Sequence, residues 1–164
     1  MKKIALFGVL LAFFCIVNHT EANDNMNALN AKEQKLVAIA AYTARGDMPK
    51  LKTALAAGLD AGLTVNEIKE VLTQLYAYCG FPRSLNALGC YMVLLKEREA
   101  AGIRDAQGRQ PGPLPAGKSI DFGTANQTKL CGAPVRGALF EFAPAIDEYL
   151  KAHLFGDIFG RDNL

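Results

Sequence analysis

The sequence has no tryptophan and only two histidines, His19 and His153. His19 lies in an N-terminal segment that we interpret below as cleaved, so His153 alone remains. This shortage excludes a metal site built from several histidines of one chain, and a serine–histidine–aspartate triad would depend on His153. The motif C-x-x-C is also absent, which excludes a thioredoxin-like dithiol within the chain. We therefore expect no metal and no cofactor.

Neither sign of charge is in clear excess, because 18 Lys and Arg residues face 16 Asp and Glu residues and the net charge is +2. A domain that binds nucleic acid usually has a strong basic surplus, so we expect no nucleic-acid partner. The uncharged run over residues 4–17 is shorter than the ~20 apolar residues that a membrane-spanning helix needs. The sequence therefore gives no reason to expect a membrane protein.

The N-terminal residues have instead the layout of a bacterial secretory signal. Lys2 and Lys3 precede the apolar run, and small Ala22 follows the polar turn at its end. This order of basic, apolar and small residues predicts a signal peptide over residues 1–22. Lipidation of Cys15 is less favoured, because a lipobox has a small residue where Phe14 stands. We expect the mature protein to be periplasmic or secreted, with no membrane attachment after cleavage.

Three cysteines remain after such a cleavage: Cys79, Cys90 and Cys131. In an oxidising compartment an odd number leaves at least one thiol unpaired within the chain. If Cys79 and Cys90 lay on one helix they would be ~16 Å apart, which is beyond the reach of a disulfide. Only a helix–turn–helix could bring these two thiols together.

The 164 residues, of which 51% are hydrophobic and 21% charged, suffice for one ordinary domain. The pattern is helical from residue 27 to residue 102. Two capping boxes open helices, Asn30 with Glu33 and Thr64 with Glu67. Gly46 and Gly62 are typical helix ends, and Pro49 suits the first turn of a second helix.

The clearest helix begins at Thr64, and its apolar residues recur at helical spacing: Ile68, Val71, Leu72, Leu75, Tyr76 and Cys79. We expect Glu70, off this stripe, on a solvated face, with an acid–base role as the alternative. The segment Gly80-Phe81-Pro82 breaks the helix, and another helix follows as far as Gly102. Its inward residues are predicted to be Leu85, Leu88, Met92 and Leu95.

Beyond residue 102 the pattern changes. Residues 103–134 are rich in proline and glycine and have no period, which predicts an irregular linker. Residues 137–153 are helical again, provided that Pro144 lies in a first turn. No strand-like alternation occurs, so the predicted fold class is all-α, a helical bundle followed by a linker and a C-terminal amphipathic helix.

Residues 61–88 contain the pattern Gly-hydrophobic-Thr, then Glu-hydrophobic-x-Glu, then Tyr-x-Gly-x-Pro, the last being Tyr78 to Pro82. This stretch, together with residues 29–37, resembles the carboxymuconolactone decarboxylase family. The resemblance implies an alkylhydroperoxidase D-like helical fold over residues 27–102 and a homo-oligomer, a trimer or a hexamer. It also implies a small organic acid or a peroxide as substrate, handled in a carboxymuconolactone decarboxylase-like or an alkylhydroperoxidase-like, peroxiredoxin-type reaction.

Four positions at the junction of the first two helices match the family's catalytic residues poorly. The family's glutamate falls on Lys35, its two peroxidase cysteines on Asp47 and Lys50, and its histidine on Ala54. The resemblance therefore implies a domain that keeps the scaffold and is catalytically impaired. The alternative is a non-catalytic module for oligomerisation or for binding a small ligand.

A second alignment of the peroxidase pattern is possible further along the chain. Glu67 and Cys79 have the spacing of the family's glutamate and first cysteine, but Pro82 and Asn86 replace the second cysteine and the histidine. We interpret this spacing as a coincidence. Cys79 and Glu67 remain the candidate catalytic residues, although a buried structural thiol and a helix cap explain them more simply.

Three further residues are candidate ligand contacts. Arg83 lies in the first turn of a predicted helix, where the helix dipole disfavours a cation, so it is a candidate for binding an anion or for a salt bridge between subunits. Tyr76 and Tyr78 could line a pocket, with packing in the core as the alternative. His153 is expected at the surface.

The C-terminal residues 135–164 resemble the lead-in helix and entry of a second copy of the same domain. Relatives with two tandem copies imply that the chain stops before the core of its second copy. The segment is also rich in aromatic residues, and these could face a partner subunit or fold over the helical bundle: Phe140, Phe142, Tyr149, Phe155 and Phe159.

Overall fold

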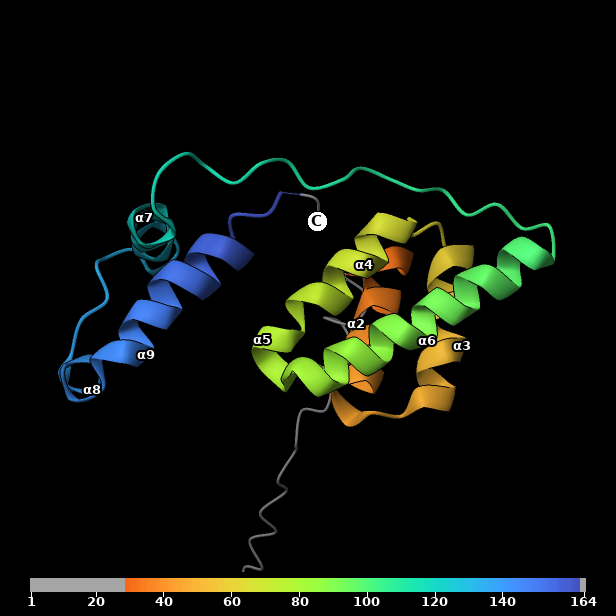
Figure 1. Ribbon diagram of the computed structural model, residues 1–164, viewed down its shortest axis with the longest axis horizontal. Coiled ribbons are helices and arrows are strands. Elements are labelled where there is room, and N and C mark those ends of the chain that lie inside the picture. The colour runs from red at the N-terminus through yellow and green to blue at the C-terminus, as the bar shows by residue number, and fades with distance from the viewer. Residues whose placement is uncertain (1–28, 163–164) are drawn as a thin grey trace, which may run out of the picture. The chain divides into compact units, whose positions relative to one another are not determined.

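The computed structural model describes residues 29–162 (Figure 1). The predicted signal peptide over residues 1–22 lies outside the described residues. Residues 31–164 form one compact unit, and the following paragraphs describe that unit. Its described residues form helices, turns and irregular segments without a β-strand. The predicted all-α fold class is therefore confirmed. None of the described helices combines the length and the hydrophobicity that a membrane span requires.

The first helix pair is α2 (Ala31–Arg45) and α3 (Met48–Asp60), joined by a two-residue corner. Gly46 adopts φ 71° there, a left-handed conformation that favours glycine. Its N–H donates to the carbonyl oxygen of Tyr42 at 2.9 Å. Asp47 then caps α3, and Pro49 stands in the first turn as its fixed φ requires. These helix limits agree with the sequence pattern.

The next helices are α4 (Val65–Gln74), α5 (Tyr76–Cys79) and α6 (Phe81–Ala100). Both hydrogen bonds of the Thr64–Glu67 capping box are present at the start of α4. The single helix predicted from Thr64 to Cys79 is divided at Leu75 into α4 and α5. The predicted break after Cys79 is confirmed, because Gly80 adopts φ 81° and Pro82 opens α6.

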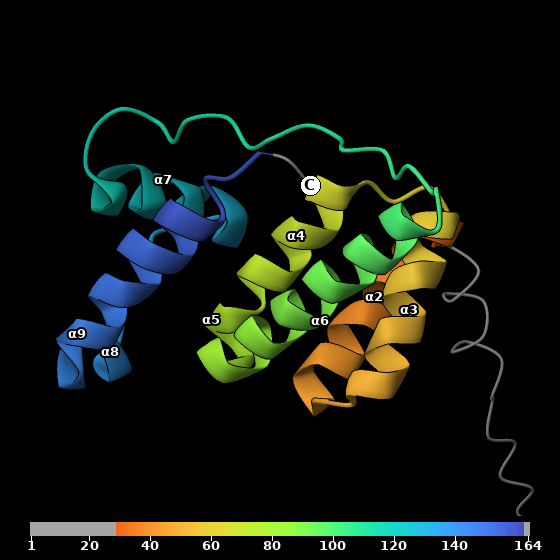
Figure 2. The same cartoon turned by 45° about the vertical axis from the view of Figure 1, so that its right-hand side comes forward.

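The core of this bundle lies between α2, α3, α4 and α6 (Figures 1 and 2). It consists of aliphatic side chains and one tyrosine: Ile39, Leu51, Ala54, Leu55, Leu59, Leu63, Val65, Ile68, Leu72, Ala87, Tyr91 and Leu94. Burial of such side chains contributes roughly 1.5–3 kcal/mol each. The bundle is therefore held together chiefly by the apolar stripes visible in the sequence.

The predicted inward face of α6 was correct at Leu88 and Leu95, which are partly buried against the core, and wrong at its other two residues. Leu85 and Met92 are 60% and 55% exposed, whereas the residues one position before each, Ser84 and Tyr91, are buried. The Ser84 hydroxyl donates to the carbonyl oxygen of Leu72 at 2.7 Å. Since small and aromatic residues fill the interior, the helix is turned by one residue relative to its leucine and methionine stripe. Leu85 and Met92 consequently lie at the surface.

Residues 103–118 form an extended connecting segment, as predicted. Its residues 106–108 lie against the start of α4, where the Val65 N–H donates to the Ala106 carbonyl oxygen at 2.9 Å. The Asn66 N–H likewise donates to the Gln107 carbonyl oxygen at 3.0 Å. These contacts satisfy N–H groups that have no partner inside the helix.

The irregular structure predicted for residues 119–131 was wrong, because this stretch forms α7 (Ser119–Cys131). The helix has little amphipathic pattern of its own and packs closely on the last helix. A Cβ atom placed on Gly123 would meet the backbone of Gly156, and one on Gly156 would lie 2.6 Å from the Ser119 carbonyl oxygen. Close backbone contact between two helices, not an apolar period, stabilises α7. Sequence periodicity cannot reveal such a contact.

The helix predicted over residues 137–153 occurs as three consecutive segments. These are α8 (Ala138–Phe142), α9 (Pro144–Glu148) and the π-helix η1 (Tyr149–Ile158). Pro144 stands at the first turn of α9, which is the one place where proline suits the helix. Both views show α7 beside the last helix (Figures 1 and 2). Several aromatic residues of this segment are exposed, with Phe142 at 88%.

Candidate functional site

The four positions that were matched to family catalytic residues lie on α2, in the α2–α3 corner and on α3. The Asp47 carboxylate accepts a hydrogen bond from the Lys50 N–H at 3.3 Å and pairs with the Lys50 ammonium at 3.4 Å. Ala54 is buried in the core, and Lys35 is half-buried on α2. Capping and packing therefore account for Asp47 and Ala54, and the corner offers no thiol at any of these positions.

Arg83 joins this corner from another helix. It lies in the first turn of α6, and its guanidinium lies against Gly46, where even a Cβ atom on the glycine would collide with it. The side chain is exposed. The absence of a side chain at Gly46 thus makes room for a cation at the α2–α3 corner. Anion binding by Arg83 stays a prediction.

Glu67, a predicted catalytic residue, is occupied by the cap of α4. Its carboxylate accepts a hydrogen bond from the Thr64 N–H at 2.6 Å, and the Glu67 N–H donates to the Thr64 hydroxyl at 3.2 Å. Burial raises the pKa of Glu67, but the Thr64 hydrogen bonds and the charge of Lys32 outweigh it and lower the pKa below its ordinary value. A lowered pKa favours the ionised carboxylate. This form can accept the hydrogen bond of a helix cap, but it has no proton to donate to a substrate.

The other predicted residues lie beyond the last residue of α4, on α5 and at the start of α6. The half-buried Cys79 thiol donates to the Leu75 carbonyl oxygen at 3.0 Å. Tyr76 stacks on Phe81 with ring centroids 4.5 Å apart, and Tyr78 is 62% exposed. The structure thus brings Tyr76, Tyr78 and Cys79 together on one short helix and separates them from Glu67.

Glu70 was expected on a solvated face, and that prediction was wrong. Its side chain is only 3% exposed and forms a two-point ion pair with Arg161, with contacts of 2.5 and 2.7 Å. Gln74 also donates to Glu70 at 2.9 Å. Burial of a carboxylate is costly unless it is paired and hydrogen-bonded, so this pair fixes the C-terminal end of the described chain to α4.

A polar row along α4 could have revealed this site. Asn66, Glu70 and Gln74 recur at every fourth residue, beside the apolar stripe. Asn66 donates to the Gly108 carbonyl oxygen at 3.0 Å and accepts from Gln110 at 3.3 Å. Asn66 and Glu70 therefore contact the returning chain, and Gln74 supports Glu70. Helical periodicity shows that such a row exists, but it cannot show which distant residues cover it.

His153 was expected at the surface and is 46% exposed there, paired with Asp157 at 2.9 Å. Asp157 also accepts a short hydrogen bond from the Ser119 hydroxyl at 2.5 Å. The hydrogen bond from Ser119, opposed by burial and aided by His153, lowers the pKa of Asp157. Because aspartate stands between the other two residues, this is not the order of a nucleophilic triad, in which histidine contacts the serine.

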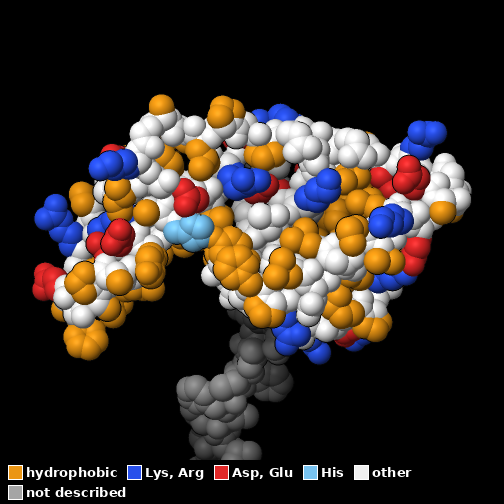
Figure 3. All heavy atoms as spheres, viewed as in Figure 1, with side chains coloured by type: hydrophobic (Ala, Val, Ile, Leu, Met, Phe, Trp, Pro, Cys, Tyr) orange, Lys and Arg blue, Asp and Glu red, His pale blue; other side chains and the backbone are white. Residues whose placement is uncertain are grey.

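The His153 ring also contacts the bundle, with its centroid 5.5 Å from that of Tyr76. Figure 3 shows this histidine in pale blue beside apolar side chains that gather over α5 and α6. The contact uses one face of the predicted ligand residue Tyr76. The contact therefore favours a packing role for the Tyr76 ring over a role in binding a ligand.

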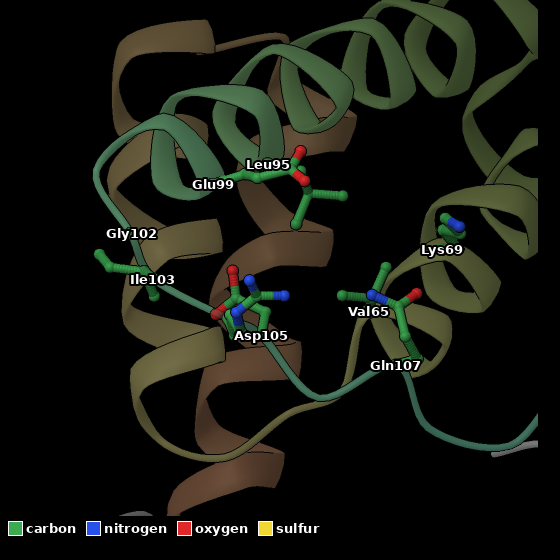
Figure 4. Close-up of a pocket in the computed structure, with 9 residues that line it drawn as sticks. Val65, Lys69, Leu95, Glu99, Gly102, Ile103, Asp105 and Gln107 are labelled. Carbon is green, nitrogen blue, oxygen red and sulfur yellow. The ribbon is translucent and has the colours of Figure 1, made fainter.

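A groove between α4 and α6 has both polar and apolar walls. One part has a volume of about 550 Å³ and a second part about 460 Å³, and Lys69, Leu95 and Glu99 line both. In Figure 4, Lys69 lies on the α4 side and Glu99 on the α6 side, and the connecting segment at Asp105 closes one end. The groove is therefore a candidate binding site that the sequence did not reveal.

Metal binding has no support in the described part of the chain, where no three His, Cys, Asp or Glu side chains are grouped as metal ligands. The described cysteines Cys79, Cys90 and Cys131 are free thiols. The burial of Cys90 raises its pKa, opposed by Lys52 and aided by Glu97. Thiolate chemistry at Cys90 is therefore disfavoured.

The comparison with known families gives one match. A family model described as the carboxymuconolactone decarboxylase family matches residues 10–91, half of the chain. The match begins within the segment predicted as a signal peptide and ends in α6, and so includes α2 to α5 and the α2–α3 corner. No curated protein matches the chain.

Proposed function

Because this chain belongs to the carboxymuconolactone decarboxylase family, we propose that it is a member with an impaired catalytic corner, and that it binds a small ligand without reducing peroxide through a dithiol. Family membership indicates a carboxymuconolactone decarboxylase-like or alkylhydroperoxidase-like domain. The proposal concerns what this particular chain does with that scaffold.

The observation that best supports the proposal is the state of the α2–α3 corner. Asp47 is used as the cap of α3, Lys50 pairs with it, and Ala54 is part of the core. General acid–base catalysis needs a side chain that can exchange a proton with the substrate. Asp47 and Ala54 are taken up by structural roles, and lysines stand at the two other positions in place of the family's glutamate and second cysteine.

The cysteines give a second line of support. Peroxide reduction by a dithiol requires a thiolate that attacks the peroxide and a second thiol close enough to form a disulfide. Cys79, Cys90 and Cys131 are separate free thiols in the described part of the chain. They lie on three different helices, α5, α6 and α7, and this distribution supports the absence of a dithiol cycle within one chain.

A second candidate function is catalysis by Cys79. Its thiol is half-buried on α5, close to the exposed ring of Tyr78 and the break at Gly80. A single reactive thiol of this kind would need an external reductant. The experiment below includes a variant that distinguishes this candidate from the main proposal.

Assembly and location are further parts of the proposal. We propose a homo-oligomer, a trimer or a hexamer as in the family, because the bundle leaves large apolar side chains exposed on α5 and α6: Tyr78, Phe81 and Val93. Apolar patches of this kind are typical of subunit interfaces. A periplasmic or secreted location is proposed on the residue order of segment 1–22 alone.

The test is turnover by the purified chain. We expect no peroxide consumption above the uncatalysed rate with a dithiol reductant, and no release of CO₂ from a carboxylated muconolactone. The Cys79→Ser variant should behave like the wild type. Turnover that the substitution abolishes would establish the second candidate, and turnover that survives it would contradict both candidates.

A further inference from the structure

We propose that the α4–α6 groove binds an amphipathic monocarboxylate, a molecule with one carboxylate and an apolar tail. The inference deepens the proposed function, on which it rests for the premise that the chain binds a small ligand. The groove is formed by α4, α6 and the connecting segment at residues 102–107. It is separate from the α2–α3 corner.

The apolar part of the site comes from residues of α6 that the sequence pattern predicted to face the core. Leu88, Met92 and Leu95 line the part of the groove with a volume of about 460 Å³, and Met92 is 55% exposed. The buried ring of Tyr91 contributes to the same wall. Apolar walls with a few polar groups are usual for small-molecule sites, and an apolar tail that covers this stripe would gain free energy by leaving water.

The charged part of the site has an excess of positive groups without partners. Within residues 29–162 the side chains of Lys69, Lys96, Arg104 and Glu99 make no hydrogen bond or ion pair. Three cations therefore face one anion. The only other acidic residue of the groove, Asp105, is held by Arg98 in two-point contacts of 2.9 Å and so is neutralised.

These charges select the sign of the ligand. The hydrogen bonds from Arg98 to Asp105, together with Asp60, raise the pKa of the guanidinium, although burial opposes them, so Arg98 keeps its positive charge beside Asp105. The surplus that a ligand meets is consequently positive, at Lys69 and Lys96 beside the apolar wall. A carboxylate can accept hydrogen bonds from these ammonium groups, whereas an alkylammonium would be repelled.

Titration calorimetry with octanoate tests the assignment, because octanoate combines one carboxylate with an unbranched apolar tail. We expect saturable binding to the full chain, and no binding of octylammonium under the same conditions. The Lys69→Met variant should bind octanoate about fivefold more weakly or worse, since it removes a cation from the groove. Met92→Asp, which places a charge on the apolar wall, should abolish binding.

Two matched controls separate the groove from general adsorption. Lys129→Met removes an exposed lysine of α7, and Leu85→Asp places a charge on α6 at a residue that does not line the groove. Both variants should bind octanoate like the wild type. Equal losses in the groove variants and their controls, or equal binding of octanoate and octylammonium, would overturn the site.

The remaining outcomes distinguish this inference from the proposed function. If a second copy of the chain covers the groove, octanoate will not bind and Met92→Asp will lower the oligomeric state by light scattering, which overturns the site. Absence of octanoate binding together with absence of turnover would refute the groove assignment and leave the impaired corner intact. Octanoate binding together with peroxide turnover would support the site and refute the impaired corner.

Discussion

The helical bundle of residues 31–102 and the C-terminal helices of residues 119–158 are stabilised in different ways. The bundle has a core of aliphatic side chains that are almost entirely buried, such as Leu55 and Ile68. The C-terminal helices pack through the backbones of Gly123 and Gly156 and are fixed by polar contacts such as the Arg161–Glu70 pair. The apolar burial of the bundle is spread over many residues, whereas the packing of the C-terminal helices depends on a few close contacts.

This difference explains how much of the structure could be predicted. The capping box of Thr64 with Glu67, the apolar stripe of α4 and the break at Gly80 are local patterns, and the sequence predicts them correctly. Gly123 and Gly156 are 33 positions apart in sequence numbering, and Glu70 and Arg161 are separated by 91. Contacts over such separations leave no periodic trace, so α7 and the partner of Glu70 could not be predicted.

The largest effect is expected in the bundle core. Leu55 is fully buried, so Leu55→Ala removes apolar contacts, leaves a cavity and should lower the free energy of unfolding by about 3 kcal/mol. Chemical denaturation measures this loss. Leu85→Ala is the matched control because Leu85 is 60% exposed, and we expect a change of at most about 0.5 kcal/mol. Similar losses in both variants would contradict the observed face of α6.

The ion pair between the C-terminal end and α4 should give the next largest effect. Arg161→Met leaves the buried Glu70 carboxylate without its cation, which should cost about 2 kcal/mol, since Arg161 itself is partly exposed. Arg109→Met provides the control, because the Arg109–Asp162 pair is exposed on both sides and such pairs contribute roughly 0–1 kcal/mol. Equal effects would show that Glu70 is not buried as described.

The glycine contact between α7 and η1 is expected to be somewhat less costly to disturb. Gly156→Ala places a Cβ atom against the Ser119 carbonyl oxygen and should destabilise the C-terminal helices by about 1–2 kcal/mol. Hydrogen exchange should show faster opening of α7 and unchanged protection of α3. Gly89→Ala meets no atom within 4 Å and should instead stabilise α6, by about 0.5–1 kcal/mol.

The smallest effect tests the assignment of Glu67 to a cap. Glu67→Ala removes the carboxylate from the Thr64 N–H and should cost about 1 kcal/mol at pH 7. Because folding lowers the pKa of Glu67, its stabilisation is full above the ordinary value of 4.5 and disappears as the pH falls through the lowered value. Denaturation at several pH values should show the wild type and the variant converging in acid. Glu148→Ala, at an exposed residue of α9, should change little at any pH.

Position by position, the candidate site was less predictable than the fold. The residue types at Lys35, Asp47, Lys50 and Ala54 already indicated an altered corner, and their placement agrees with structural roles for Asp47 and Ala54. The groove could not be foreseen, because it depends on the rotation of α6 that buries Tyr91 and exposes Met92. A one-residue rotation of a helix changes which side chains meet a ligand while preserving the same apolar period.

The most direct test of the impaired corner is the fate of the thiols after peroxide is added to the reduced chain without a reductant. Intact-mass analysis with thiol alkylation should show Cys79, Cys90 and Cys131 still free after peroxide has been present for many turnover times of a dithiol enzyme. Rapid formation of an intramolecular disulfide, in step with the loss of one peroxide per chain, would contradict the account.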